Sequence, residues 1–347
     1  MPDFFLPLVG CVLVFAASFL LVAQVRRYAV ERSLLDHPNE RSSHVAPTPR
    51  GGGLAFVVMF LLVTLVLYLL GAVAGSLAMA LLGSGAGVAA LGFWDDHGHV
   101  PVRWRLLGHF FAASWALFWL GGLAPVSLGD TRLDLGWFGQ AVALLYLVWL
   151  LNLYNFMDGI DGLAAGEAIC VCAAMVICYL AAGAGPVSFG RYGLEALLAI
   201  AVAGFFCWNF PRAKVFMGDV GSGFLGIVLG VLSIEAAAFD PALLWCWLIM
   251  LGVFMVDATF TLLHRLLRGE AVQQAHRSHA YQFAARRLGS HVPITLGAAA
   301  LNLLWLLPWA LLVAGGWVQG ALALVVAYLP LIGLAGYFKA GSSEVGK

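Results

Sequence analysis

The chain has 347 residues, of which 62% are hydrophobic and only 10% are charged. A soluble protein carries about 25% charged residues, so this composition excludes a soluble globular domain, a disordered chain and a small disulfide scaffold. The 18 basic and 18 acidic residues balance, which gives no indication of a nucleic-acid partner. The sequence is that of an integral membrane protein.

Apolar runs long enough to cross a membrane recur along the whole chain. A bilayer core about 30 Å thick needs roughly 20 apolar residues of helix. The first run lacks a basic leader and a small-residue cleavage site, which favours a retained span over a signal peptide. We expect an all-α, polytopic membrane protein with one domain over residues 1–347 and eleven transmembrane helices. The runs lie near 4–24, 51–73, 75–94, 105–123, 138–156, 163–183, 193–209, 221–238, 241–264, 292–313 and 319–338.

The distribution of charge predicts an orientation. With eleven spans, sixteen of the 18 basic residues fall on one side of the membrane, and only Arg132 and Arg191 fall on the other. The positive-inside rule then places the N-terminus in the periplasm and the C-terminus in the cytoplasm. All nine histidines lie in or next to the basic loops. We therefore expect the active site on the cytoplasmic loops.

The first polar segment, FWDDHGHVPVRWR, ends the third predicted span. Asp95 and Asp96 are adjacent, and His97, His99, Arg103 and Arg105 follow. Paired carboxylates beside a membrane are costly unless cations or a metal neutralise them. The segment indicates either a magnesium-linked site or a general base, and the alternative is a solvated loop with incidental salt bridges.

The second segment, NLYNFMDGIDGLAAG, ends the fifth predicted span. Asn152, Asn155 and Asp158 recur every three residues and share one helical face, and Asp161 continues the stripe. Its two DG pairs permit a turn or a close approach to a ligand. A site for a phosphate-bearing substrate explains this set, whereas a capped helix end explains only one aspartate.

The third segment, NFPRAKVFMGDVGSGFLG, precedes the eighth predicted span. Lys214 supplies a cation, Phe216 an aromatic ring, and Asp219 stands where an N-cap or a metal ligand would stand. A helix N-terminus also attracts phosphate. Both the N-cap and the metal ligand remain open for Asp219.

The fourth segment is the loop 265–290, which follows Asp257. Its run AHRSHAYQ contains His276, Arg277 and His279. Histidines three residues apart can share one helix face, and with arginines they suit a diphosphate. The alternative is a basic loop that serves only the positive-inside rule.

These four segments together resemble the polyprenyl-phosphate N-acetylhexosamine-1-phosphate transferases, of the glycosyltransferase family 4 type. That family contains the bacterial enzymes that initiate peptidoglycan, O-antigen and teichoic acid linkage. A fifth segment, DHPNERSSHVAPTPRGGGLA, is similar to the family signature D-x-P-N-x-R…H…P-T-P-R-x-G-G. The resemblance covers residues 36–282, and the matching positions of the fifth segment are Asp36, Pro38, Asn39, Arg41, His44, Pro47, Thr48, Pro49, Arg50, Gly52 and Gly53.

The resemblance implies a reaction in which undecaprenyl phosphate attacks the β-phosphate of a UDP-N-acetylhexosamine and releases UMP. It implies Mg²⁺, with Mn²⁺ as an alternative, held by Asp219. Phe216 would stack on uracil, and Asp95 would bind or deprotonate the lipid phosphate, supported by Asp96. The nucleotide and diphosphate would be bound by Asn152, Asn155, Asp158, Asp161, Lys214, His276, Arg277, His279, Thr48 and Arg50. A direct attack and a route through an aspartyl phosphate both fit these residues.

Two departures from the family pattern bear on the substrate. His99 stands where the family's acidic motif usually has a further Asp or Asn, and H-R-S-H replaces the common H-x-H-H. The second variant resembles the branch that starts O-antigen, and hence lipopolysaccharide, with FucNAc, QuiNAc or GlcNAc. The resemblance also implies a multi-pass protein of the bacterial inner membrane and makes a homodimer an option.

The alternative from another functional class is a secondary transporter of an anionic solute. Transporter sites lie near the bilayer midplane and are commonly formed by related repeats. The polar motifs of this chain instead gather at helix ends on one side, and the sequence has no internal repeat that we would defend. A CDP-alcohol phosphotransferase is a closer chemical rival, but its D-G-x-x-A-R motif is absent.

Overall fold

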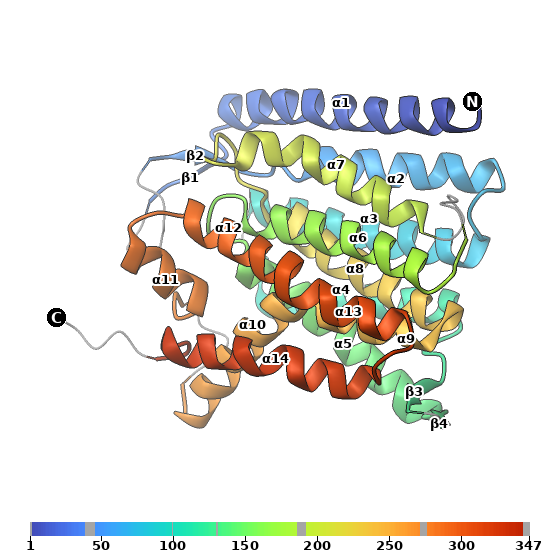
Figure 1. Cartoon of the computed structure of the whole chain (residues 1–347). Coiled ribbons are helices and arrows are strands. Elements are labelled where there is room, and N and C mark those ends of the chain that lie inside the picture. The colour runs from blue at the N-terminus through green and yellow to red at the C-terminus, as the bar shows by residue number, and fades with distance from the viewer. Residues whose placement is uncertain are drawn as a thin grey trace.

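A computed structural model describes residues 2–38, 46–98, 100–129, 131–185, 192–270 and 276–342. The chain is mostly helical, and its long helices lie side by side (Figure 1). The helices are α1 (Pro2–Glu31), α2 (Leu54–Leu69), α3 (Gly75–His97), α4 (Val102–Leu120), α5 (Gly136–Met157), α6 (Leu163–Ala181), α7 (Gly193–Asn209), α8 (Asp219–Phe239), α9 (Pro241–Met250), α10 (Gly252–Leu267), α11 (Ala280–Leu288), α12 (Val292–Leu301), the π-helical turn η1 (Asn302–Leu306), α13 (Leu307–Ala314) and α14 (Gly320–Tyr337).

Several helices are long and apolar enough to cross a membrane, so the chain is a multi-pass membrane protein. Within the described ranges seven helices meet this criterion, and the bent pair α9–α10 makes an eighth if it counts as one span. The helices α2 and α7 are apolar but shorter. Every predicted apolar run lies on a helix or a helix pair. The count of eleven spans and the orientation stay predictions.

The apolar run 241–264 forms two helices instead of the single straight span that we expected. The axes of α9 and α10 differ by 66° across Leu251. Gly252 begins α10, and a Cβ there would lie 2.8 Å from the ring of Tyr328 on α14. The bend directs α10, which carries the buried polar residues Asp257 and Arg265, toward the end of the bundle that holds α11 (Figure 1).

The helix α8 forms the centre of the bundle and packs against α3 and α5. Of its apolar window 83% is buried, against 17% for α1. Small residues let its backbone approach its neighbours, as is common between membrane helices. A Cβ on Gly226 would lie 2.6 Å from the carbonyl oxygen of Leu150 on α5. A Cβ on Gly92 of α3 would lie 2.4 Å from the carbonyl oxygen of Asp219.

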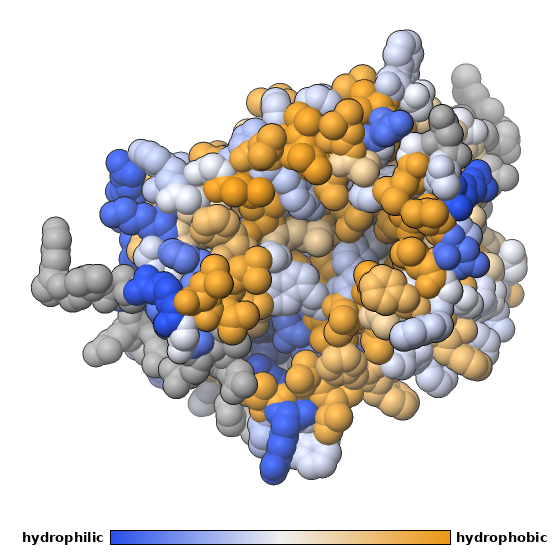
Figure 2. Space-filling model, turned by 90° about the horizontal axis from the view of Figure 1, so that it is seen from below, coloured by the Kyte–Doolittle hydropathy of each residue, from blue (hydrophilic) through white to orange (hydrophobic). Residues whose placement is uncertain are grey.

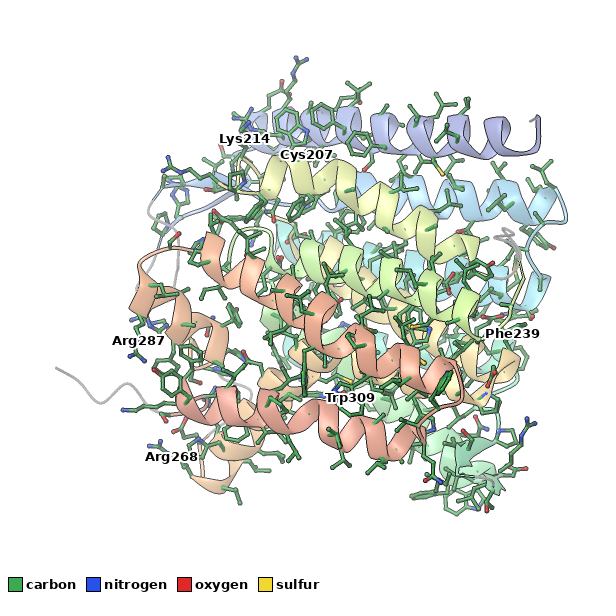
Figure 3. The ribbon with its side chains drawn as sticks, viewed as in Figure 1. Cys207, Lys214, Phe239, Arg268, Arg287 and Trp309 are labelled. Atoms are coloured by element: carbon green, nitrogen blue, oxygen red, sulfur yellow. The ribbon has the colours of Figure 1, made fainter. Side chains whose placement is uncertain are left out.

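The two ends of the bundle differ. One end carries α11 and the two-stranded sheet of β1 (Leu35–Asp36) and β2 (Thr48–Pro49), and the hairpin of β3 (Val126–Leu128) and β4 (Thr131–Leu133) lies at the other (Figure 1). Lys214, Arg268 and Arg287 all lie at the α11 end, which we call the basic end (Figure 3). These three basic residues, which the sequence analysis assigns to one side of the membrane, therefore lie at one end of the bundle.

The middle of the molecular surface is apolar. Figure 2 shows hydrophobic residues over much of the face seen from below, with hydrophilic residues at its left and right ends and in a smaller patch toward its lower edge. Exposed apolar side chains such as Phe111, Leu145 and Leu329 belong to the helices of the bundle. An apolar band of this kind matches a lipid environment.

Candidate active site

Asp219, the first residue of α8, lies at the basic end with two polar partners. Its Oδ1 accepts a hydrogen bond of 2.7 Å from Nδ2 of Asn155 on α5. Its Oδ2 forms an ion pair of 3.2 Å with Nη1 of Arg105 on α4. About a third of its side chain remains exposed. The carboxylate is therefore oriented by protein groups and is still accessible to a ligand.

Arg105 joins this carboxylate to a second one. The same Nη1 atom also donates to Oδ2 of Asp95, near the end of α3. The other oxygen of Asp95 accepts a hydrogen bond of 2.7 Å from the backbone N–H of Val100. One guanidinium thus lies between two carboxylates of helices that are far apart in sequence. We call Asp95, Arg105 and Asp219 the carboxylate–arginine cluster.

Asp96 has a different environment from its neighbour Asp95. Its Oδ1 and Oδ2 accept hydrogen bonds of 3.1 Å each from the backbone N–H groups of Asp219 and Val220. The side chain is buried. Asp96 therefore caps the N-terminus of α8, where a negative charge also interacts favourably with the helix dipole. Its oxygens are occupied by backbone, so Asp96 positions Asp219.

A narrow cleft between α3, α4, α5 and α8 is lined by the carboxylate–arginine cluster together with further polar and apolar residues. The polar residues are Asp95, Arg105, His109, Asn152, Asn155 and Asp219, and the apolar ones are Val88, Leu91, Gly92, Leu151 and Gly223.

The segment after α5 turns beside the cluster. Asp158 follows the helix as its C-cap, and desolvation, followed by the negative charges of Asp219, Asp96 and Asp161, raises its pKa well above the ordinary value. Asp161 instead contacts other groups of the protein. Its Oδ2 accepts the backbone N–H of Ala213 at 3.1 Å, and its Oδ1 lies 3.3 Å from Nδ1 of His291.

The close approach of α11 to this segment requires a glycine at position 159. A Cβ on Gly159 would lie 2.1 Å from Oη of Tyr281. That hydroxyl donates a hydrogen bond of 2.9 Å to the carbonyl oxygen of Phe156 at the end of α5. Burial and the nearby carboxylates Asp257 and Asp158 raise the pKa of Tyr281, so the hydroxyl keeps its proton and can donate.

The histidine segment is fixed by Asp257 of α10. The carboxylate accepts the backbone N–H groups of Ala280 and Tyr281 at 2.9 and 3.0 Å. It also lies 3.4 Å from Nδ1 of His279, which is buried and N-caps α11. The rings of His276 and His279 stack with centroids 4.9 Å apart. The pair stands next to the end of α5, since the ring of His279 also lies 6.2 Å from that of Phe156.

The remaining predicted site residues make their observed contacts outside the cluster. Arg50 is directed at the C-terminal end of α3, where its Nη2 donates to the carbonyl oxygen of Asp96. The hydroxyl of Thr48 donates to the carbonyl oxygen of Ala46 at 3.0 Å. The backbone of Phe216 pairs with Pro49 and Gly52 of the β2 segment. Arg277 accepts a hydrogen bond from Arg286 through its carbonyl oxygen.

Lys214 does not join the carboxylates. Its Nζ lies 5.7 Å from the ring centroid of Trp208 on α7, and its carbonyl oxygen accepts a hydrogen bond from Arg26 of α1. Figure 3 shows it at the outer edge of the basic end, next to α1. Three residues of the predicted signature, Asn39, Arg41 and His44, lie outside the described residues, as does His99.

Comparison with known proteins assigns the family. The model of glycosyl transferase family 4 matches residues 77–237. A probable undecaprenyl-phosphate N-acetylglucosaminyl 1-phosphate transferase of Bacillus subtilis is 30% identical over 272 residues, which are 74% of this chain and 71% of the relative. A decaprenyl-phosphate N-acetylglucosaminephosphotransferase of Mycolicibacterium smegmatis is 32% identical over 285 residues, or 73% of this chain and 68% of the relative. The chain belongs to glycosyl transferase family 4.

The family resemblance expected from the motifs is thereby confirmed. A phospho-N-acetylmuramoyl-pentapeptide-transferase of Moorella thermoacetica is also similar, at 36% identity over 209 residues, which are 55% of this chain and 63% of the relative. The matched region of the glycosyl transferase family 4 model contains the whole carboxylate–arginine cluster.

Residues that the sequence analysis did not assign to the site also take part in it. Arg105 was noted only as a cation that follows the paired aspartates, although buried carboxylates require such a partner. Asp257 has no predicted role beyond preceding the histidine loop, although an acidic residue in an apolar run indicates a specific partner. Ser222 belongs to the same sequence segment as Asp219 but had no predicted role, and its hydroxyl receives a hydrogen bond of 3.2 Å from Nδ2 of Asn155.

Proposed function

We propose that the protein transfers N-acetylhexosamine-1-phosphate from a UDP-sugar to undecaprenyl phosphate and releases UMP. In this reaction a phosphate oxygen of the lipid forms a bond to the β-phosphorus, and the bond from that phosphorus to the oxygen of the α-phosphate breaks. The carboxylate–arginine cluster, which lines a cleft between membrane helices, is the observation that carries the proposal. The family and the printed names of the relatives support the same reaction class.

The cluster supplies the groups that such a transfer needs. Arg105 places a guanidinium, which binds phosphate oxygens well, between Asp95 and Asp219. In the proposed reaction Asp95 would bind the lipid phosphate or accept its proton. Asn155 orients Asp219 through the 2.7 Å hydrogen bond, and Asp96 fixes the start of α8. Preorganised charges of this kind stabilise the charge that develops during transfer.

Mg²⁺ is the proposed metal ion, with Asp219 as its ligand and Mn²⁺ as an alternative. Among the described residues no three His, Cys, Asp or Glu side chains form a metal-binding group. This fits Mg²⁺, which is commonly held by one or two carboxylates together with water and substrate phosphates. When bound, the ion would neutralise charge on the diphosphate oxygens. The partly exposed Asp219 carboxylate can serve as such a ligand.

The other polar groups would bind the nucleotide and its diphosphate. Asn152 and Asn155 line the cleft, and the stacked rings of His276 and His279 with Arg277 lie beside the end of α5. Phe216 would stack on uracil. Asp158, which lies beside Asp219, would contact the donor substrate. The contacts of Asp161, Arg50, Thr48 and Lys214 within the protein favour positioning roles for these four residues.

The proposed setting is the bacterial inner membrane, with the basic end in the cytoplasm. There the enzyme would start a lipid-linked polysaccharide such as O-antigen of lipopolysaccharide, with GlcNAc, FucNAc or QuiNAc as the sugar. The H-R-S-H variant is the residue-level support for the 6-deoxy sugars. Membership of glycosyl transferase family 4 favours this reaction over the alternative of a secondary transporter.

UMP release by the purified protein tests the proposal. The assay contains undecaprenyl phosphate, Mg²⁺ and one of UDP-GlcNAc, UDP-GalNAc or UDP-FucNAc. We expect lipid-dependent release with one preferred sugar and none from Asp219→Asn. Asp134→Asn, the same change at an exposed position of the opposite end, is the matched control and should retain activity. No release with any sugar from folded protein would overturn the proposal.

A further inference from the structure

A buried acid and a buried amide face each other inside the bundle, away from the carboxylate–arginine cluster. Glu167 of α6 and Asn302, the first residue of η1, are 2% and 0% exposed. Nδ2 of Asn302 donates a hydrogen bond of 2.5 Å to Oε2 of Glu167. The second oxygen of each group, Oε1 of Glu167 and Oδ1 of Asn302, has no hydrogen-bond partner among the described residues.

The surroundings of Glu167 disfavour an ionised carboxylate. A charge at this depth is costly unless a cation is present, and no ion pair of the described residues includes Glu167. Among the described residues, three titratable groups near Glu167 are Tyr154 of α5, Cys170 of α6 and Tyr328 of α14. None of these three groups carries a positive charge.

The two orphaned oxygens become complementary when Glu167 holds a proton. A protonated carboxyl is a donor as well as an acceptor, so the O–H on Oε1 can be donated to Oδ1 of Asn302. The existing hydrogen bond runs in the opposite direction, from the amide to Oε2. Together they would form a reciprocal acid–amide pair in which every polar atom of the two groups has a partner.

This pair continues a row of contacts between two parallel helices. Starting at the basic end, the hydroxyl of Thr295 on α12 donates to the carbonyl oxygen of Asp161 at 2.8 Å. A Cβ on Gly166 would lie 3.7 Å from Cγ2 of Thr295. Thr295 and Asn302 are seven residues apart and so share one face of the helix. The row therefore fixes how α12 lies along α6.

The π-helical turn begins at the residue that makes the pair. Single π turns within helices occur frequently at functional sites, and Pro308 at the start of α13 also removes a backbone donor from this stretch. Glu167 thus holds the point at which the α12–α13 helix changes its winding. Toward the basic end, α12 begins directly after His291, and Nδ1 of His291 lies 3.3 Å from Oδ1 of Asp161.

We propose that Glu167 is protonated and forms with Asn302 an acid–amide pair that sets the register of α12 against α6, and so positions Asp161 and His291 beside the active site. Glu167 is in this view a positioning residue and touches no substrate. Its protonation is independent of the activity, whereas its effect on catalysis rests on the proposed function. Two experiments separate these parts.

Infrared spectroscopy of the purified protein at neutral pH tests the protonation. We expect the carbonyl band of a buried protonated carboxyl in the wild type and its loss in Glu167→Gln. Glu31→Gln, at the exposed end of α1, is the matched control and should leave the band unchanged. A spectrum of Glu167→Gln that has lost no such band would overturn the proposal, whatever the activity of the protein.

A set of variants tests the positioning. Glu167→Gln keeps a hydrogen-bonding partner for Asn302 and should retain a wild-type KM for the UDP-sugar. Glu167→Leu alone leaves Asn302 unpaired and should lower the melting temperature. In Glu167→Leu/Asn302→Leu no buried polar group is unpaired, so stability should largely return, while kcat/KM should stay about 10- to 100-fold low because the register is no longer specified.

The outcomes are distinguishable. A stable double variant with wild-type kcat/KM means that the pair is only structural, and the positioning role is then wrong. If the wild type itself releases no UMP, the proposed function fails, and the melting temperatures of the same four proteins still decide the pairing. In that case, equal melting temperatures of Glu167→Leu and the double variant would overturn the acid–amide pair.

Discussion

Asp257 holds the first turn of α11 in the same way that Asp96 holds the first turn of α8. Both oxygens of Asp96 accept backbone N–H groups of α8 at 3.1 Å. Both oxygens of Asp257 accept backbone N–H groups of α11, at 2.9 and 3.0 Å. Each carboxylate comes from a neighbouring helix. The two caps therefore fix the helix starts that carry Asp219 and His279 within the site.

The two adjacent aspartates should respond differently to the same substitution. Asp96→Asn removes one acceptor from the α8 cap, so we expect a loss of about 1–2 kcal/mol in stability and a lower melting temperature. Asp95→Asn should melt near the wild type, because Arg105 keeps its contact with Asp219, yet it should release no UMP. Thermal melts and UMP assays of both variants check this contrast. Equal destabilisation by the two substitutions would contradict the assignment of Asp96 as the cap.

Arg105 should be needed both for turnover and for stability. Its side chain is about a third exposed, but that of its partner Asp95 is only 7% exposed, so Arg105→Gln leaves a buried carboxylate unpaired and should also lower the melting temperature. Loss of a preorganised charged donor typically lowers kcat about 10²- to 10³-fold, which we expect for Arg105→Gln. Arg105→Lys keeps the charge without the planar fork and should recover part of the rate. Arg103→Gln is the matched control, because Arg103 is exposed and its guanidinium lies over Trp104.

Asp158 should make the wild-type protein less stable as the pH rises. Its pKa is raised in the folded state, so folding favours the protonated form. The free energy of unfolding therefore falls as the pH rises from about 3.9, the pKa of an aspartate in the unfolded chain, up to the raised pKa of Asp158 in the folded protein. Asp158→Asn removes this loss and should melt above the wild type at pH 7. The difference should shrink as the pH approaches 4. Melting curves in EDTA across this range are the measurement, and a constant difference would be inconsistent with the raised pKa.

The sequence motifs predicted which segments form the site better than they predicted what each residue does. Asn152 and Asn155 line one cleft, as their spacing indicates. Asp95 and Asp96 look equivalent in sequence, but the N–H groups that bind Asp96 belong to residues more than 120 positions later. No local pattern reports such a contact. Lys214 lies over Trp208, which is six residues earlier, because the segment that follows α7 turns back on itself.

The helices were predictable from apolar runs, and the bend between α9 and α10 was not. Hydropathy is continuous across Leu251, where the axis turns by 66°. The bend lets α10 place Asp257 against α11, a tertiary contact that no apolar window encodes. The role of Glu167 could not be predicted either. One acidic residue in an apolar run changes the hydropathy little, and its buried partner Asn302 lies 135 residues away in the sequence.

The contact between Gly159 and Tyr281 gives a prediction that a second substitution can reverse. Alanine at position 159 would bring its Cβ to 2.1 Å from the Tyr281 hydroxyl, so either α11 or the segment after α5 must move. We expect Gly159→Ala to lower both the melting temperature and UMP release. Tyr281→Phe removes the hydroxyl and costs only its hydrogen bond to Phe156, about 1 kcal/mol.

The double variant Gly159→Ala/Tyr281→Phe should then be more active than Gly159→Ala alone, because the clashing atom is gone. A double-mutant cycle on melting temperature and on kcat/KM measures this coupling. Additive effects would show that Gly159 is needed for its own backbone freedom and not for the approach of α11. Recovery in the double variant would mean that the distance between α5 and α11, and with it the place of the histidine pair, controls the reaction.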